Sequence, residues 1–75
     1  MKNLPDMSKY PPPLKITFVD GDIWENVELE AVYYAGNYSY VPEDDNEDEL
    51  FTTYQGIGYS IKASEIQEIE SQKQN

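Results

Sequence analysis

Apolar and polar residues alternate along most of the chain between residues 14 and 70. In residues 15–19, Ile16 and Phe18 share one face of the run. The same two-residue period continues over residues 23–34. Alternation with this period is typical of strands that bury one face of a sheet and expose the other. The pattern therefore predicts an antiparallel β-protein.

Turn-forming residues divide this pattern into strands. Asp20-Gly21 predicts a tight hairpin, because glycine tolerates the positive φ that such a turn requires. Glu25 and Asn26 interrupt the alternation after Trp24, which predicts a bulge or bend early in the second strand. We expect five main strands, over residues 15–19, 23–34, 50–54, 57–61 and 66–69, and a further short strand over residues 38–41.

The C-terminal segment is open to two interpretations. Ser64 and Gln67 have the spacing of a helix capping box, which is compatible with a short helix over residues 64–72. Only Ile66 and Ile69 are apolar in that segment, and so narrow a seam gives a helix little to bury. We therefore expect one short helical turn followed by a closing strand.

Together these elements predict an all-β fold: a small, five-stranded, strongly bent antiparallel barrel. A chain of 75 residues forms one domain at most, and a domain near that size buries only about 60% of its unfolded surface. The expected core combines the inward positions of the strands, namely Ile16, Phe18, Ile23, Val27, Leu29, Ala31, Tyr33, Leu50, Ile57, Tyr59, Ile61, Ile66 and Ile69.

Proline sets the N-terminal segment apart. Pro5 and the run Pro11-Pro12-Pro13 lack backbone donors and fix φ, which excludes a helix or a central strand there. We expect residues 1–13 to form an extended, Pro-rich arm outside the core. Residues 14–70 form the barrel domain, and residues 71–75 fray.

Charge is distributed unevenly along the chain. Fifteen acidic residues oppose five lysines, with no arginine and no histidine, which gives a formal net charge of -10. No basic residue lies between Ile16 and Ile61, whereas eleven acids do. These acids are Asp20, Asp22, Glu25, Glu28, Glu30, Glu43, Asp44, Asp45, Glu47, Asp48 and Glu49. Solubility alone is the simpler interpretation, but a protein that needs only solubility more often intersperses both signs.

The residue inventory argues against catalysis and against bound cofactors. Without His or Cys, acid–base chemistry depends on carboxylates, and no pair of them has a spacing that indicates a cleft. Residues 43–49, which we expect to form a solvated acidic loop, alternate Asp44, Asn46 and Asp48 as a calcium-binding loop does. Glu49 and Gln55, however, stand where that loop needs glycine and glutamate. We expect a non-enzymatic protein with no cofactor and no metal.

Six tyrosines lie in the expected strands. Aromatic side chains on a sheet can stack nucleic-acid bases, but that mode also needs a basic groove for the phosphates. Because residues 16–61 carry no base, we expect no direct binding of nucleic acid. Packing in the core and across strands, with some phenols facing a protein partner, is the expected role of Tyr33, Tyr34, Tyr38, Tyr40, Tyr54 and Tyr59.

The order of the elements resembles that of Sm-like and SH3-like small barrels. Residues 58–69, Gly-Tyr-Ser-Ile-Lys-Ala-Ser-Glu-Ile-Gln-Glu-Ile, are similar to the Sm-like ending in which a strand passes through a short turn into an Ile-x-x-Ile closing strand. Residues 15–29 are similar to the first two strands of that barrel. RNA-binding Sm proteins carry an Asp-x-x-x-Asn set and an Arg-Gly pair, and the corresponding residues 30–34 and 56–58 contain neither. The resemblance implies the architecture and not an RNA site.

These features favour a non-enzymatic acidic binding module that occupies a basic, nucleic-acid-binding site on another protein. Glu28 and Glu30 would point the same way about 7 Å apart in a regular strand, close to the separation of successive phosphates. The arrangement resembles small inhibitors of the phage or mobile-element type that mimic nucleic acid in charge and size. The eleven acids named above would form the partner-binding face.

A second hypothesis is a small accessory or structural subunit that joins a larger assembly through its apolar edge strands and its Pro-rich arm. The two hypotheses differ in salt dependence, because only the first relies on charge for affinity. Charge repulsion between copies favours a monomer or a weak dimer. We expect a cytoplasmic protein, because the chain has no signal-peptide pattern, no stretch long enough to span a bilayer and no cysteine.

Overall fold

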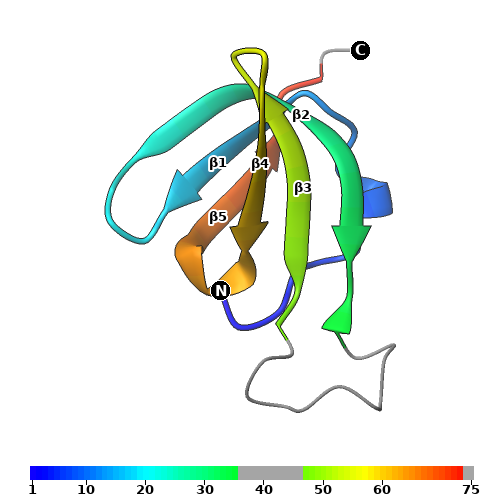
Figure 1. Cartoon of the computed structure of the whole chain (residues 1–75), viewed down its shortest axis with the longest axis vertical. Helices are drawn as coiled ribbons and strands as arrows, with labels where there is room; N and C mark the ends of the chain where they lie inside the picture. The colour runs from blue at the N-terminus through cyan, green and yellow to red at the C-terminus, as the bar shows by residue number, and fades with distance from the viewer. Residues whose placement is uncertain (36–46, 74–75) are drawn as a thin grey trace.

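The computed structural model describes residues 1–35 and 47–73 (Figure 1). Within these ranges the chain forms one antiparallel sheet with the strand order β4-β3-β2-β1-β5. The elements are η1 (Met7–Lys9), β1 (Leu14–Phe18), β2 (Ile23–Tyr33), β3 (Glu49–Tyr54), β4 (Ile57–Lys62), η4 (Ala63–Glu65) and β5 (Ile66–Ser71). The prediction of an antiparallel β-fold is confirmed, and the strand expected over residues 38–41 lies outside the described residues.

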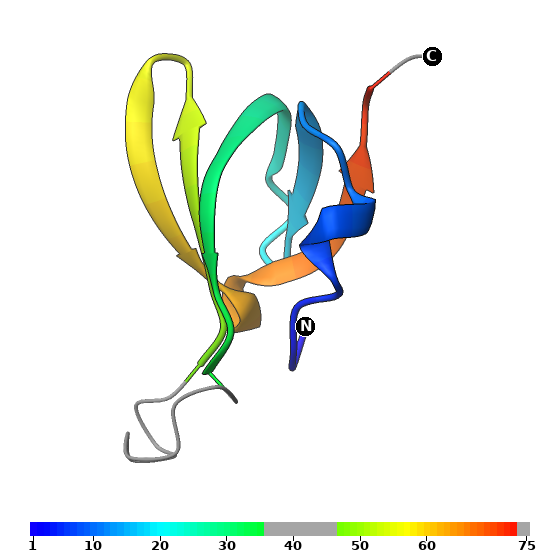
Figure 2. The same ribbon diagram turned by 90° about the vertical axis from the view of Figure 1, so that its right-hand side faces the viewer.

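The sheet curves strongly, with β3 and β4 on one side and β1 and β5 on the other (Figure 2). The two edge strands are β4 and β5, and the 3-10 turn η4 carries the chain from one to the other. Among the described strands no ladder joins β4 to β5, so closure into a barrel stays a prediction. The short turn and closing strand expected at the C-terminal end are confirmed.

Two bulges bend β2. The first lies where Glu25 and Asn26 both face Lys15, because Leu14 pairs with Val27 while Ile16 pairs with Trp24. Asn26 has a φ of +58°, a conformation that asparagine tolerates better than most residues. The bulge expected at this position is confirmed.

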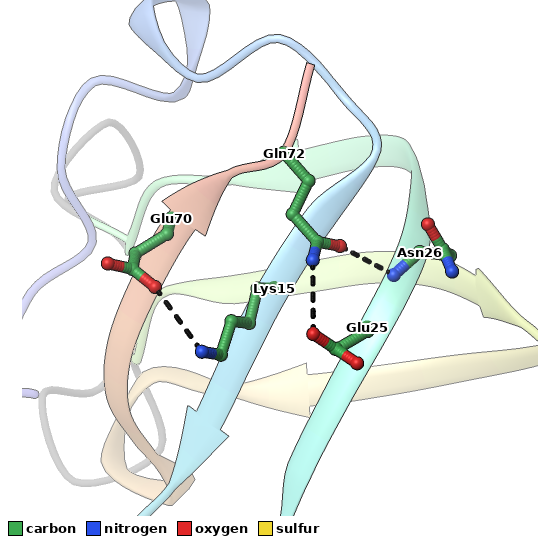
Figure 3. A network of polar contacts seen from close by, with 5 residues as sticks. All are labelled: Lys15, Glu25, Asn26, Glu70 and Gln72. Atoms are coloured by element: carbon green, nitrogen blue, oxygen red, sulfur yellow. Dashed lines mark hydrogen bonds and ion pairs between the residues drawn. The ribbon is translucent and has the colours of Figure 1, made fainter. Parts of the chain in front are cut away.

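The side chain of Gln72 holds this bulge against the end of β5 (Figure 3). Its Oε1 accepts a 2.7 Å hydrogen bond from the backbone N–H of Asn26, and its Nε2 donates to Glu25 at 3.3 Å. Beside it, Lys15 forms a 3.8 Å ion pair with Glu70 (Figure 3). The bulge therefore has a specific partner from the far end of the chain.

The second bulge falls at Glu30 and reverses the faces of the strand beyond it. Leu29 pairs with Thr52, whereas Ala31 pairs with Phe51, so Glu30 is the extra residue. Ala31 is consequently exposed, and Val32 packs against the core instead. The predicted core position of Ala31 is wrong for this reason. Tyr33 is half-buried and follows Ala31 in the alternation.

The core lies on the concave side of the sheet and includes part of the N-terminal segment. Leu4 and Met7 are buried with the strand residues, so the prediction that residues 1–13 lie outside the core is wrong. The hydroxyl of Tyr34 accepts a 2.8 Å hydrogen bond from the Met7 N–H and donates to the Pro5 carbonyl at 3.1 Å. The buried cluster comprises Leu4, Met7, Leu14, Ile16, Val27, Leu50, Ile61, Ala63, Ile66 and Ile69.

Three expected core residues lie at the ends of hairpins and are exposed instead. Ile23 is 54% exposed, Ile57 56% and Tyr59 38%. Ile23 and Ile57 are the first residues after the two hairpin turns, and Tyr59 lies on the edge strand β4. The prediction that these residues are buried in the core is wrong. Within the described residues, no helix has the length and apolar character needed to cross a bilayer.

Candidate partner-binding surface

Four aromatic rings from four strands meet near these hairpin ends. Trp24 of β2 stacks parallel on Tyr54 of β3, with ring centroids 4.3 Å apart and an interplanar angle of 5°. Phe18 of β1 contacts Trp24 edge to face at 4.8 Å, and Tyr59 of β4 contacts it at 4.8 Å with a 59° tilt. Offset and edge contacts of this kind stabilise aromatic clusters beyond simple area burial. Trp24 is therefore held from several sides.

A hollow of about 320 Å³ opens beside this cluster. We call it the aromatic hollow, and it lies between the β1–β2 hairpin, β4 and η4. Its lining residues are Phe18, Val19, Asp20, Asp22, Trp24, Tyr59, Ser60, Ile61 and Glu65. The apolar and aromatic members supply its walls, and three carboxylates come from two separate elements. Among the described residues that line it, none is basic.

The β1–β2 turn forms one wall of the aromatic hollow, and local hydrogen bonds fix its shape. Gly21 has a φ of +100°, and its N–H donates to the Phe18 carbonyl at 3.0 Å. Asp20 Oδ1 accepts from the Asp22 N–H at 3.1 Å, which is an Asx turn. The N–H of Val19 donates to the Glu65 carbonyl at 3.0 Å and so joins this wall to η4.

The β3–β4 hairpin forms the opposite wall. Gln55 and Gly56, with φ values of +52° and +82°, turn the chain so that Tyr59 lies across from Thr52. Positive φ at both central residues is the feature of the tight turn whose twist matches paired strands. The Thr52 hydroxyl also donates to the Tyr59 carbonyl at 3.3 Å. Both walls are therefore set by backbone geometry.

Five of the predicted site residues lie where a partner can reach them. Asp20 and Asp22 are exposed on the rim of the aromatic hollow, and Glu25, Glu28 and Glu30 are exposed on β2. The Glu30 carboxylate accepts a 3.1 Å hydrogen bond from the Thr53 hydroxyl. Because Glu30 is the bulged residue, the regular two-residue spacing expected from Glu28 to Glu30 does not apply.

Asp48 is the exception, because it is only 7% exposed and belongs to the fold. Its two carboxylate oxygens accept 2.9 Å hydrogen bonds from the backbone N–H groups of Leu4 and Ala35. Its carbonyl accepts a third from the Ala63 N–H at 2.9 Å. The prediction that Asp48 contributes to an exposed acidic face is wrong. One carboxylate instead ties the N-terminal segment to the end of β2.

The remaining predicted site residues lie near η4 or outside the described part of the chain. The hydroxyl and the backbone N–H of Ser64 donate hydrogen bonds to the Glu47 carboxylate and hold its pKa below the ordinary value of 4.5. The Ser64 N–H lies 2.7 Å from Glu47 Oε1. Glu49 accepts a 3.1 Å hydrogen bond from the Ser60 hydroxyl. Three acids lie outside the described residues: Glu43, Asp44 and Asp45.

Sequence reasoning missed the aromatic half of this surface. Tyr59 was assigned to the core, Trp24 was noted only for its place near a bulge, and Glu65 was not connected with Asp20. The available signal was the pair of large apolar residues, Val19 and Trp24, that lies on the two sides of an acidic turn. Large apolar side chains on both sides of a solvated turn indicate a surface that binds something.

An apolar, ring-walled hollow with carboxylates at its rim is suited to binding an amphipathic cation. Among the described residues, no three His, Cys, Asp or Glu side chains gather in a way that would hold a metal ion. Comparisons of the chain with protein-family models, curated proteins and solved structures find no match. The functional argument therefore rests on the chemistry of the surface.

Proposed function

We propose that this protein is a non-enzymatic binding module that places an acidic surface against a basic site on another protein. The observation that carries the proposal is the exposure of Asp20, Asp22, Glu25, Glu28 and Glu30 on one hairpin, in a stretch with no basic residue. Complementary charge steers association and selects partners of opposite sign.

The basic site we have in mind is one that binds nucleic acid, so that this protein would act as an inhibitor or a mimic. The net charge of -10 on 75 residues supports this view. A phosphate-like row on β2 does not support it, because the bulge at Glu30 breaks the regular spacing. The proposal therefore depends on the density of exposed carboxylates and not on their spacing.

The strand order and the position of η4 support the resemblance to a small Sm-like or SH3-like barrel. The chain has no arginine, and the residues that would hold RNA in that family are missing from residues 30–34 and 56–58. We therefore propose a protein partner and no direct nucleic-acid ligand. A cytoplasmic location and a monomeric or weakly dimeric state belong to the same proposal.

The alternative function, an accessory subunit that docks through a Pro-rich arm, receives less support. The carbonyls of Pro11 and Pro13 accept hydrogen bonds from Ser71 and Gln72, and Met7 is buried. A segment held against β5 in this way is less available to another protein. The exposed residues Ile23 and Ile57 are what an accessory role would use.

A matched pair of variants tests the proposed function. The first, Glu25→Gln with Glu28→Gln and Glu30→Gln, removes three exposed charges from β2. The control, Asp6→Asn with Glu68→Gln and Glu70→Gln, removes three exposed charges outside the proposed surface. Both immobilised variants are compared with the unmodified protein for the host proteins that they retain and for the salt at which each elutes.

We expect basic, nucleic-acid-binding proteins to elute from the first variant at lower salt than from the control, because fewer counter-charges hold them. Circular dichroism of both variants checks that the sheet persists. Elution of the same proteins at the same salt from both variants would show that the acids of β2 serve only solubility. Retention that is insensitive to salt would favour the accessory-subunit alternative.

A further inference from the structure

We infer that the aromatic hollow is the receptor for an arginine side chain presented by the basic partner. The inference rests on the proposed function and adds that this protein recognises its basic partner through one arginine side chain. The apolar walls of the hollow would accept the three-carbon stem of arginine, and the lining acids Asp20, Asp22 and Glu65 would pair with its guanidinium group. Glu65 Oε2 also accepts a 3.4 Å hydrogen bond from the Lys62 N–H.

The walls suit a flat cation. Phe18, Trp24 and Tyr59 all line the hollow, and Tyr59 is 38% exposed. A cation over an aromatic face is attracted by the ring quadrupole, and the guanidinium plane also stacks on rings. An uncharged apolar occupant would take water away from the rim carboxylates without replacing their hydrogen bonds, which is unfavourable.

The rim favours arginine over lysine. Carboxylates reach the hollow from two elements, the β1–β2 turn and η4. Guanidinium presents five N–H donors in a fixed plane and can therefore satisfy Asp20 or Asp22 on one side and Glu65 on the other. The lysine ammonium is a compact, strongly hydrated charge that loses more on leaving water. Phosphate and other anions are excluded by the same carboxylates.

This chain cannot supply the occupant itself. It contains no arginine, so neither its own residues nor a second copy can fill the site in this way. Lys15 of β1 pairs with Glu70 on β5, and Lys62, which follows the lining residue Ile61, does not itself line the hollow. The occupant must therefore come from outside these 75 residues, and we assign it to the basic partner.

The site is also preformed, which lowers the cost of binding. Trp24 is fixed by its 4.3 Å stack on Tyr54, and the hydrogen bond from Val19 to Glu65 joins the two sides of the rim. When a side chain enters the aromatic hollow, few groups of this protein therefore lose conformational freedom.

Trp24 gives the test a direct reporter, because it is the only tryptophan of the chain. Blocked peptides of sequence Gly-Gly-X-Gly-Gly are titrated into the full chain, with arginine, lysine, citrulline or norleucine at X. Binding is followed by Trp24 fluorescence and by the amide signals of residues 18–24 and 59–65. Citrulline has nearly the shape of arginine without its charge.

We expect the arginine peptide to bind roughly tenfold more tightly than the citrulline peptide and about threefold more tightly than the lysine peptide, with shifts centred on the hollow. Asp20→Asn with Asp22→Asn should weaken arginine binding about fivefold. Asparagine keeps the Asx turn, so the wall persists. The matched control, Glu68→Gln with Glu70→Gln, removes the same charge from β5 and should change binding less than about twofold.

Equal affinity for arginine and citrulline, equal affinity for arginine and lysine, or shifts away from the hollow would each overturn the inference. So would equal weakening by the two double variants. These results would leave the proposed function to its own test, because the β2 variant used there keeps Asp20, Asp22 and Glu65. If arginine binds in the hollow while the β2 variant elutes as its control does, the proposed function fails and the arginine site stands.

Discussion

Aspartates lie near the two ends of β2, and their environments are opposite. Asp48 is buried, and each oxygen of its carboxylate is paired with a backbone N–H, from Leu4 or Ala35. Asp20 and Asp22 are exposed on the rim of the aromatic hollow, beside rings that are partly open to solvent. The first arrangement ties the end of β2 to the N-terminal segment, and the second leaves the carboxylates before β2 exposed to solvent.

The difference shows that burial, and not residue type, separates the structural acid from the acids that we propose bind a partner. A carboxylate removed from water must find donors inside the protein, and Asp48 finds them in two segments that would otherwise be unconnected. Carboxylates that stay in water keep their capacity for a partner. Substitutions at buried positions should therefore lower the free energy of unfolding much more than substitutions at exposed positions.

The largest expected effect is that of Asp48→Ala. It leaves the buried N–H groups of Leu4 and Ala35 without acceptors, and hydrogen bonds to charged groups contribute about 1.5–3 kcal/mol each. We expect a loss of roughly 3–5 kcal/mol in the free energy of unfolding, measured by urea denaturation. Asp22→Ala, at an exposed position, should cost less than about 0.5 kcal/mol. Equal losses in the free energy of unfolding for Asp48→Ala and Asp22→Ala would contradict the distinction between the buried and the exposed aspartates.

Apolar residues should show the same contrast with a smaller effect. Met7 is 4% exposed, and Met7→Ala should cost about 2–4 kcal/mol through the cavity that it leaves. Ile57 is 56% exposed, and Ile57→Ser should change the free energy of unfolding by less than about 0.5 kcal/mol. Thermal unfolding followed by circular dichroism compares the two. If Met7→Ala is as stable as the unmodified protein, residues 1–13 do not contribute to the core and form an arm outside it.

The strands themselves could be predicted from the sequence, because their two-residue alternation is a local signal. Where the register shifts, that signal fails. The bulge at Glu30 exchanges the faces of Ala31 and Val32, and the sequence holds no glycine or proline there to mark it. The bulge at Asn26 was predicted, since polar residues visibly interrupt the pattern.

The acidic half of the candidate site could also be predicted, because Asp20 and Asp22 lie in an obvious solvated turn. The aromatic half could not, since Trp24 and Tyr59 meet only through the curvature of the whole sheet. The burial of Asp48 was equally hidden. It stands inside a run of acids, and its donors, Leu4 and Ala35, are 44 and 13 residues away in sequence.

The smallest expected effect concerns Glu47, which lies beside Asp48 but is not fully buried. Hydrogen bonds from the Ser64 hydroxyl and N–H depress its pKa in the folded state. A depressed pKa means that ionised Glu47 stabilises the fold above its unfolded pKa, near 4.5, and that this contribution is lost as the pH falls through the lower folded value. Unfolding measurements on Glu47→Gln should reveal it.

The control for this measurement is Glu28→Gln, which removes one exposed charge from β2 and relieves the self-repulsion of the chain to a similar extent. At pH 7 we expect Glu47→Gln to be less stable than Glu28→Gln by roughly 0.5 kcal/mol, since solvent screens the contact at Ser64. The difference between the two variants should shrink as the pH falls below 4.5 and Glu47 becomes protonated. If the difference in unfolding free energy between the two variants stays constant from about pH 7 to about pH 3, the negative charge of Glu47 does not contribute to stability. The hydrogen bonds from Ser64 alone would then account for the effect.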